Sequence, residues 1–293
     1  MINRKDVQKA IRLITPPLII AAYKKSPLYQ TANAFFNKPT KDKIPSWHTI
    51  VSGDLAGLKI FANNTGGFRE MINGSYDKFF FDYVKKFDLT GKTVYDIGSH
   101  VGFTALQFAK VIGPEGKVIA FEPNEFNARR FKYILSENGD LAGRIDIHEI
   151  AISQSQGSED FLFGDDVDGG TSSGSFIDRS HTFWKKEVYE EQIGFVRKTI
   201  QTLPLDLLES ELLITKAPAL IKIDVEGAEQ LVLEGGRDLI KKNKPILLIE
   251  IHSIFSMFEV GRILNELEYT TSLLKEESDG RCFIAAHPLI KNT

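Results

Sequence analysis

The order of apolar and amphipathic segments between residues 93 and 152 constrains the fold more than any other feature of the chain. Short apolar segments alternate there with longer segments of helical periodicity. The strands expected in this region are 93–97, 117–122 and 144–152, and the helices are 102–112 and 125–137. Strands separated by helices form a parallel sheet with right-handed crossover connections. We therefore predict an α/β fold.

The C-terminal part of the chain predicts a different strand connection. Apolar stretches within "ALIKIDV" and "KPILLIEIHS" indicate a fourth and a fifth parallel strand, and "SMFEVGRILNELE" indicates a helix. The last strand-like segments, "YTTSLL" and "RCFIAAH", are separated by "KEESDG", which is too short for a helical crossover. We expect an antiparallel hairpin there. A parallel core with such a hairpin is similar to the sheet of seven-stranded methyltransferases and differs from the all-parallel dinucleotide fold.

A glycine-containing turn follows the first strand of this region, in the stretch "TVYDIGSHVGFTA". A strand, a tight turn and a helix N-terminus together present backbone N–H groups to a nucleotide-like cofactor. Glu122 ends the next strand, twenty residues after Gly102, where an acid accepts hydrogen bonds from ribose hydroxyls. The residues predicted to bind the cofactor are Asp96, Gly98, Ser99, His100, Gly102, Glu122, Pro123 and Asn124.

The chemistry around this turn distinguishes between two cofactors. A dinucleotide site normally has the pattern GxGxxG, whereas Gly98 and Gly102 are separated here by "SHV" and preceded by Asp96. A carboxylate close to such a turn suits a cofactor with an ammonium group. S-adenosylmethionine has that group and NAD does not, so S-adenosylmethionine is the predicted cofactor, and an NAD-dependent oxidoreductase is the less favoured alternative.

Acidic residues and one histidine follow the fourth and fifth strands. Asp224 and Glu226 come after the fourth strand, and Glu250 and His252 end the fifth. Ligands of open α/β sheets bind at the carboxyl ends of the strands, so we expect these side chains to face the cofactor loop. Such a cluster can deprotonate a hydroxyl, hold a divalent metal or hydrogen-bond a sugar. Glu229, in the first turn of the next helix, either belongs to this cluster or stabilises the N-terminus of that helix. His252 is either a catalytic base or a structural histidine.

The N-terminal segment differs in charge from the rest of the chain. Residues 1–44 contain nine Lys or Arg and two Asp, a net charge of +7, whereas the whole chain has a net charge of −3. Its apolar stretch "LITPPLIIAAY" is too short to span a membrane and contains Pro16 and Pro17. We expect this arm to contact an anionic membrane surface or a second subunit, or else to pack on its own domain.

Composition excludes some classes of function. The net charge of −3 gives no general attraction for nucleic acid, which needs clustered Lys and Arg. The one cysteine, Cys282, cannot form an internal disulfide, and no cleavable signal pattern is present, so a cytoplasmic protein is expected, with peripheral contact at the inner face of the membrane as an option. Cys282 is interpreted as a buried strand residue.

The predicted organisation is a basic extension over 1–45, capping strands and a helix over 46–92, and a catalytic domain over 93–290. An insertion at about 153–200 is interpreted as a substrate-binding lid, with a flexible surface loop as the alternative. The spacing of its three aspartates resembles calcium ligands, but no complete calcium loop follows. An exposed tryptophan would suit sugar stacking. The residues concerned are Asp165, Asp166, Asp168 and Trp184.

Several motifs together resemble the FkbM family of S-adenosylmethionine-dependent methyltransferases. They are "VYDIGSHVGFTA", "VIAFEPN", "TLPLDLL", "LIKIDVEGAEQLVLEGG" and "ILLIE", in this order over roughly residues 75–255. The resemblance implies a Rossmann-like, seven-stranded class I methyltransferase fold. It also implies methyl transfer to hydroxyls of sugars, polyketides and related natural products, often in glycan biosynthesis. It places Asp96, Gly98 and Gly102 in the cofactor loop and Glu122 at the ribose.

The same resemblance matches Asp224 and Glu226 to the acids of the family's fourth-strand motif. We expect in-line methyl transfer to an acceptor hydroxyl, with Asp224 as the first candidate for contact with that hydroxyl, either as base or as metal ligand. His252 is the second candidate, and Glu226 and Glu250 support them. A small molecule or a glycan is the expected acceptor. The remaining alternative is a non-catalytic cofactor-binding scaffold of a glycan assembly; the sequence leaves the oligomeric state open, with a homo-oligomer as one option.

Overall fold

The computed structural model describes residues 42, 44–164, 175–177, 195–278 and 280–289. The chain divides into two compact units, Met1–Ile44 and Pro45–Thr293. Almost all of the first unit lies outside the described residues, so the membrane and subunit contacts of the basic arm stay predictions. Asp165, Asp166, Asp168 and Trp184 lie outside the described residues as well. Among the residues that are described, no helix has both the length and the apolar character that crossing a bilayer requires.

A seven-stranded mixed sheet forms the centre of the second unit, in the order β12-β13-β11-β10-β3-β4-β5. The strands β3, β4, β5, β10 and β11 pair in parallel, whereas β13 is antiparallel to both β11 and β12. The α/β prediction with a terminal antiparallel hairpin is therefore confirmed. The strands are β3 (Thr93–Ile97), β4 (Lys117–Phe121), β5 (Ile145–His148), β10 (Pro218–Ile223), β11 (Ile246–Ile251), β12 (Tyr269–Glu276) and β13 (Cys282–Pro288).

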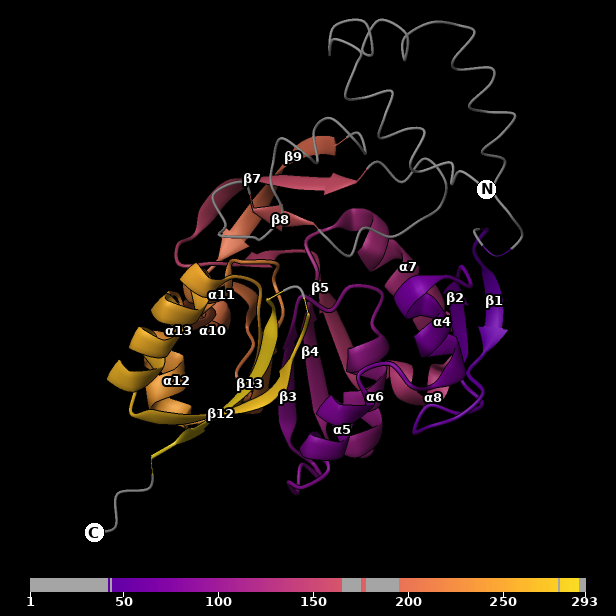
Figure 1. Cartoon of the computed structure of the whole chain (residues 1–293), viewed down its shortest axis with the longest axis horizontal. Helices are drawn as coiled ribbons and strands as arrows, with labels where there is room; N and C mark the ends of the chain where they lie inside the picture. Colours follow the sequence, from indigo (N-terminus) through magenta and orange to yellow (C-terminus); the bar gives the residue numbers. More distant parts are fainter. Residues whose placement is uncertain (1–41, 43, 165–174, 178–194, 279, 290–293) are drawn as a thin grey trace, which may run out of the picture. The chain divides into compact units, whose positions relative to one another are not determined.

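Successive residues of each central strand face opposite sides of this sheet, as the period of two in a strand requires. Val94 and Val118 belong to one buried cluster, and their neighbours Tyr95 and Ile119 belong to another. Figure 1 shows α10–α13 on the second side. The first side is covered by α4 (Gly66–Asn73), α5 (Lys78–Val84), α6 (Phe103–Val111), α7 (Glu125–Ser136) and α8 (Gly139–Ala142). The second is covered by η2 (Leu205–Leu207), α10 (Leu208–Leu212), α11 (Glu229–Glu234), α12 (Arg237–Asn243) and α13 (Ile254–Glu266).

The segment before β3 has two strands and two helices. β1 (Ser46–Thr49) and β2 (Lys59–Ala62) pair antiparallel, as expected. The single helix predicted between them and β3 is wrong, because α4 and α5 are separate. Gly74 (φ 78°) and Asp77 (φ 48°) take left-handed backbone conformations there, and these interrupt a right-handed helix.

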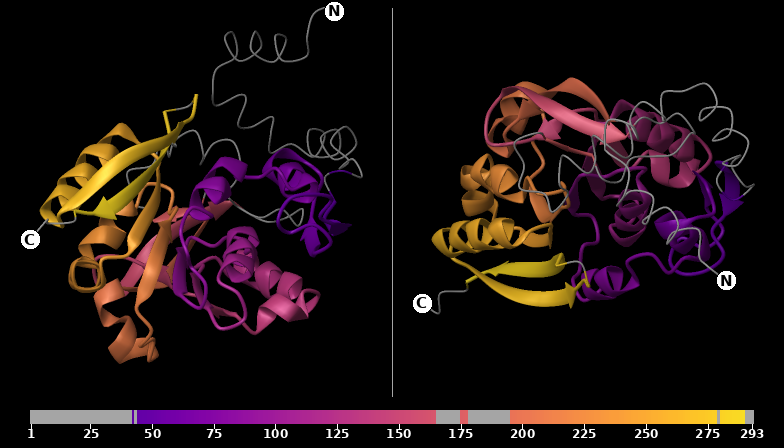
Figure 2. Two further views of the ribbon diagram at one scale, coloured as in Figure 1. Left: turned by 90° about the horizontal axis from the view of Figure 1, so that it is seen from below. Right: turned by 45° about the horizontal axis from the view of Figure 1, so that its top comes forward.

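The insertion contributes a second, four-stranded sheet with the order β6-β9-β7-β8, drawn beyond one end of the large sheet (Figures 1 and 2). The prediction of one strand over 144–152 is wrong: β5 ends at His148, and the next strand pairs with β9 instead. Within the 153–200 insertion, the described residues 157–164, 176–177 and 195–200 form strands, and 153–156 and 175 do not. Its members are β6 (Ala151–Ile152), β7 (Gly157–Gly164), β8 (Phe176–Ile177) and β9 (Phe195–Leu203).

Phe161 and Ile177 on the small sheet pack against Ala228 and Leu231 at the start of α11. These contacts hold the small sheet beside the carboxyl ends of β10 and β4. The apolar run Phe161–Phe163 is a strand signal, but the Gly, Ser and Asp residues that follow it favour a loop by composition.

Candidate active site

A cavity of about 480 Å³ opens at the carboxyl ends of β3, β4, β10 and β11. Gly98 and Glu122 line it from the predicted cofactor side, and Asp224, Glu226 and Glu250 line it from the acidic side. The structure thus brings together two groups of residues that are more than a hundred positions apart in the chain. This location agrees with the rule that ligands of parallel sheets bind where the strands end.

The turn after β3 requires glycine because the chain passes very close to its neighbours. Gly98 has φ 78°, and a Cβ atom there would lie 1.8 Å from the carbonyl oxygen of Asp224. Gly102 has φ 84°, precedes α6, and would place a Cβ atom 1.9 Å from the ring of Phe131. The absence of side chains lets this turn lie against β10 and α7, so it forms a narrow wall of the cavity.

Glu122 is buried and is fixed by the backbone around it. Its Oε2 accepts a hydrogen bond from the His100 N–H at 2.8 Å, and its Oε1 accepts one from the Asn124 N–H at 2.9 Å. The Asn127 side chain donates a longer bond of 3.3 Å. Burial raises the pKa of Glu122 to about 7, although these hydrogen bonds oppose the rise. A carboxylate has about four acceptor positions, so one remains on Oε2 for a ribose hydroxyl.

The other residues of the predicted cofactor group have different surroundings. Ser99, His100 and Pro123 line the cavity. His100 takes a left-handed conformation (φ 51°), and burial lowers its pKa to about 4, so its ring is neutral at pH 7. Asn124 instead caps α7, because its Oδ1 accepts a hydrogen bond from the Phe126 N–H at 3.0 Å.

Lys222 connects the two sides of the site. Its ammonium donates a 2.8 Å hydrogen bond to the Gly98 carbonyl and lies 3.3 Å from Asp96 Oδ1 and 3.2 Å from Asp224 Oδ2. Burial would lower the pKa of Lys222, but the two carboxylates outweigh it and raise that pKa. Asp96 is fully buried, and burial raises its pKa despite Lys222. The geometry therefore gives Asp96 a partner inside the protein.

Asp224 stays ionised in this environment. Burial alone would raise its pKa, but Lys222 and His252 together hold that pKa below the ordinary value. Its Oδ2 faces Lys222, and its Oδ1 lies 3.6 Å from His252 Nε2. One oxygen of Asp224 is therefore engaged by an ammonium while the other points toward the histidine.

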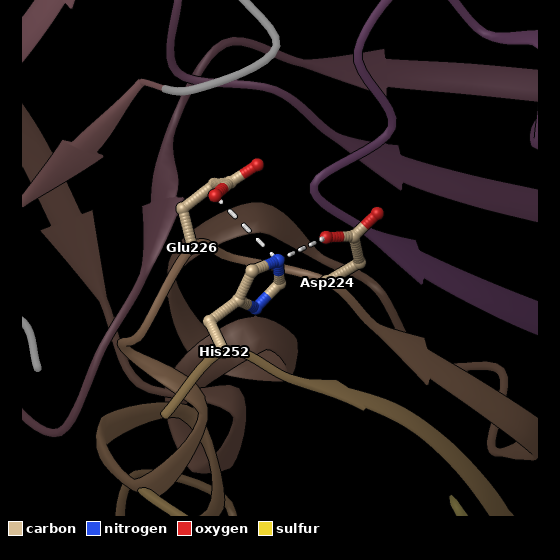
Figure 3. A group of neighbouring side chains, drawn as sticks. All are labelled: Asp224, Glu226 and His252. Carbon is tan, nitrogen blue, oxygen red and sulfur yellow. Dashed lines mark ion pairs between the residues drawn. The ribbon is translucent and has the colours of Figure 1, made fainter. Parts of the chain in front are cut away.

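His252 is 1% exposed and is held by Glu229, the first residue of α11. The Nδ1 of His252 and the Oε1 of Glu229 are 2.8 Å apart, and the same oxygen accepts the Gly227 N–H at 2.8 Å. The Nε2 of His252 points between Asp224 and Glu226, as Figure 3 shows. Burial opposes protonation of His252, but Glu226, Glu229 and Glu250 outweigh it and raise the pKa to about 10.

Glu250 lies at the edge of this group. Its Oε1 accepts a 2.8 Å hydrogen bond from Arg281 in the terminal hairpin and is 3.6 Å from His252 Nε2. Burial and the charge of Asp224 raise the pKa of Glu250 well above its ordinary value. The three acids and the histidine predicted as catalytic are therefore neighbours, and Arg281 orients Glu250.

Sequence reasoning missed Lys222, Arg281 and Tyr76, which all line the cavity. For Lys222 a signal was present, because it is the one charged residue in the otherwise apolar strand "PALIKI". Strands of a parallel sheet covered on both faces are buried, so a charge within one requires a partner. Tyr76 and Arg281 come from segments before β3 and after β12, and their sequence context carries no comparable signal.

The comparisons with known proteins bear on the family. A family model described as the methyltransferase FkbM domain matches residues 96–274. The fold is similar to that of methyltransferase FkbM from Methylobacillus flagellatus KT, with 20% identity and a TM-score of 0.48; the alignment covers 69% of this chain but only 44% of that one. No curated protein matches the chain significantly.

Two further solved structures are similar at lower identity. Precorrin-6y C5,15-methyltransferase from Geobacter metallireducens is 9% identical over 75% of this chain and 92% of its own, with a TM-score of 0.44. Fibrillarin from Aeropyrum pernix, solved with natively bound S-adenosyl-L-methionine, is 12% identical over 68% of each chain, with a TM-score of 0.39. The family match runs from the end of β3 into β12, which is more than half of the residues. The chain therefore belongs to the FkbM family of S-adenosylmethionine-dependent methyltransferases.

Proposed function

We propose that the protein transfers the methyl group of S-adenosylmethionine to a hydroxyl oxygen of a small-molecule, sugar or glycan acceptor. The observation that carries this proposal is the position of Asp224. Its backbone carbonyl touches the cofactor turn at Gly98, and its side chain lines the same cavity as Glu226 and Glu250. A carboxylate that borders both the cofactor turn and an acidic pocket is placed to contact a hydroxyl beside the cofactor.

The residues present fit S-adenosylmethionine. Gly98 leaves room at the turn, and Glu122 has an acceptor position left for a ribose hydroxyl. The neutral ring of His100 lines the same part of the cavity. Direct pairing of Asp96 with the cofactor's ammonium group stays a prediction, and the burial of Asp96 beside Lys222 favours an indirect role.

The cofactor, when bound, supplies an activated methyl group and its own leaving group. The protein's residues then have to align the acceptor, exclude water and take one proton. Lys222 holds one oxygen of Asp224, so the other oxygen can contact the acceptor hydroxyl, either directly as a base or as the ligand of a cation that binds the hydroxyl. Arg281 fixes Glu250, which can accept a hydrogen bond from a second hydroxyl of a sugar-like acceptor.

We infer a cytoplasmic location from the single cysteine. Cys282 is buried in β13, and a chain with one cysteine has no internal disulfide to protect it in an oxidising compartment.

The test is a transfer assay with radiolabelled S-adenosylmethionine and a panel of monosaccharides, nucleotide sugars and glycan fragments. We expect Asp224→Asn to bind S-adenosylhomocysteine nearly as well as the native protein but to lose transfer by about 100-fold or more. Glu137→Gln is the control, because Glu137 is exposed at the end of α7. Full activity of Asp224→Asn would refute the role of Asp224. Cofactor binding without transfer to any hydroxyl would favour the non-catalytic scaffold.

A further inference from the structure

His252 Nε2 lies behind the acidic residues that line the cavity. It is buried and has no hydrogen-bond partner among the described residues. Three carboxylate oxygens surround it, from Glu226 at 3.5 Å and from Asp224 and Glu250 at 3.6 Å. All three distances exceed the 2.7–3.2 Å range of a normal N–H···O hydrogen bond. Direct hydrogen bonding therefore does not explain why this atom faces the acids.

The same separations match the edges of a metal coordination polyhedron. First-row divalent ions bind nitrogen and oxygen ligands at about 2.1 Å, so neighbouring ligand atoms lie roughly 3.0 Å apart around an octahedral ion and roughly 3.4 Å apart around a tetrahedral one. One ligand atom each from Asp224, Glu226 and His252 lies within 4.8 Å of the other two. Figure 3 shows the Nε2 and the two carboxylates directed toward a common space. A single cation between them would be bound by Nε2 of His252 and by one oxygen each of Asp224 and Glu226.

The partners behind this group also fit a metal centre. Glu229 accepts a hydrogen bond from the Nδ1 N–H of His252. A cation that displaces the Nε2 proton would therefore meet a lone pair directed at the acids. Carboxylate–histidine pairs of this kind orient metal ligands in many proteins. Lys222 engages Oδ2 of Asp224 and leaves Oδ1 for the ion. Arg281 holds Glu250, so Glu250 is a neighbour rather than a ligand.

We propose that Asp224, Glu226 and His252 bind one divalent cation at the acceptor end of the cavity. Two carboxylates and one imidazole suit first-row ions such as Mn²⁺ or Fe²⁺ better than Ca²⁺, which prefers oxygen ligands alone. Three protein ligands leave coordination positions open, and Asp224 and Glu226 line the cavity, so those positions face the acceptor. One part of this inference rests on the proposed function: the acceptor hydroxyl occupies one of the open coordination positions of the cation.

The test is titration of the full chain, saturated with S-adenosylhomocysteine, with Mn²⁺ alone at fixed pH, following the electron paramagnetic resonance signal of free Mn²⁺. One ion per chain should bind. Asp224→Asn and Glu226→Gln should each weaken Mn²⁺ binding by more than about 100-fold, the upper end of the loss seen when a residue that only orients a metal ligand is substituted. Asp77→Asn is the matched control, because Asp77 influences Asp224 through its charge but lies outside the three-residue cluster.

Binding that fails, or that survives both cluster substitutions unchanged, would overturn the metal site. A His252→Gln variant, checked by circular dichroism for folding, adds a third ligand test. The methyl-transfer assay with and without EDTA separates this inference from the proposed function. Transfer that persists in EDTA without Mn²⁺ binding contradicts the metal site alone. Mn²⁺ binding that depends on the cluster, without transfer to any hydroxyl, supports the metal site and contradicts the proposed function alone.

Discussion

The carboxylate of Glu122 accepts a 2.8 Å hydrogen bond from the backbone N–H of His100. This bond joins the end of β4 to the glycine turn after β3, so the acid expected at the ribose and the turn expected around the cofactor form one unit. A second bond, from the Asn124 N–H, ties the same carboxylate to the start of α7. The end of β4, the glycine turn and the start of α7 therefore fix the direction of the Glu122 side chain before a cofactor binds. A preorganised side chain reduces the ordering cost of cofactor binding.

Substitution of Glu122 tests this arrangement. Glu122→Gln keeps the size of the side chain but replaces one carboxylate oxygen by an amide NH₂ group. The backbone N–H of either His100 or Asn124 then loses its acceptor. Loss of a charged hydrogen bond costs about 1.5–3 kcal/mol, so the dissociation constant of S-adenosylhomocysteine should rise roughly 10- to 100-fold in calorimetry. Glu137→Gln should leave that constant unchanged. Equal affinities of native protein and Glu122→Gln would remove Glu122 from the cofactor site.

The pH dependence of cofactor binding follows from the same residue. Since the pKa of Glu122 is raised to about 7, the carboxylate is mostly ionised at pH 8 and mostly protonated at pH 6. Only the ionised form offers all its oxygen lone pairs to ribose. We expect affinity for S-adenosylhomocysteine to fall by about tenfold from pH 8 to pH 6. The Glu122→Gln variant should not share that fall, and a parallel fall in both proteins would contradict this origin.

Stability should change with pH in the opposite direction. The folded pKa of Glu122 is raised from 4.5 to about 7, so its favourable contribution to folding is complete below pH 4.5 and is lost as the pH rises through 7. Urea unfolding of native protein and Glu122→Gln across this window isolates the contribution. As the pH rises, the unfolding free energy of the native protein should fall relative to that of Glu122→Gln. No change in that difference between pH 4.5 and 8 would contradict the raised pKa.

The sequence predicted those parts of the site that depend on local rules. Gly98 and Glu122 follow strands whose apolar pattern is clear, and parallel strands bring their carboxyl ends to one edge. The role of Lys222 could not be predicted in this way, because its partners Asp96 and Asp224 and the Gly98 carbonyl are specified by strand pairing rather than by spacing. The contact of Glu229 with His252 likewise depends on packing of α11 beside β11.

The small sheet was missed for a related reason. Its strand β9 pairs with β7 along its length and with β6 at one end, so each strand depends on pairing across the insertion. The region between the long strands is rich in Gly, Ser and Asp, which favours a loop by composition alone. Strand propensity is sensitive to neighbours, and those neighbours are distant in the sequence.

Gly102→Ala should destabilise the protein through the contact between the glycine turn and α7. The new methyl group would meet the ring of Phe131 at 1.9 Å, and the backbone already has φ 84°. Left-handed strain and overpacking each cost about 1–3 kcal/mol, so a loss of roughly 2–5 kcal/mol is expected in urea unfolding. Gly139→Ala is the control, because nothing lies within 4 Å of its Cβ position and it begins α8. Similar stabilities of the two variants would contradict the close approach of the turn to α7.

The last prediction concerns the buried charges around Lys222. Its ammonium lies between Asp96 and Asp224, so Lys222→Met leaves the buried carboxylate of Asp96 and the partly buried carboxylate of Asp224 without their cation. Breaking a buried pair in this way costs about 3–5 kcal/mol, because the remaining charge stays desolvated. Lys117→Met is the comparison, since Lys117 pairs with the half-exposed Asp146 at 2.9 Å and should cost less than about 1 kcal/mol. Adding Asp96→Asn to Lys222→Met should restore part of the lost stability, because it neutralises one of the stranded carboxylates. If urea unfolding shows instead that the stability losses of the two single variants add up in the double variant, Asp96 and Lys222 act independently, and the ion pair between them is contradicted.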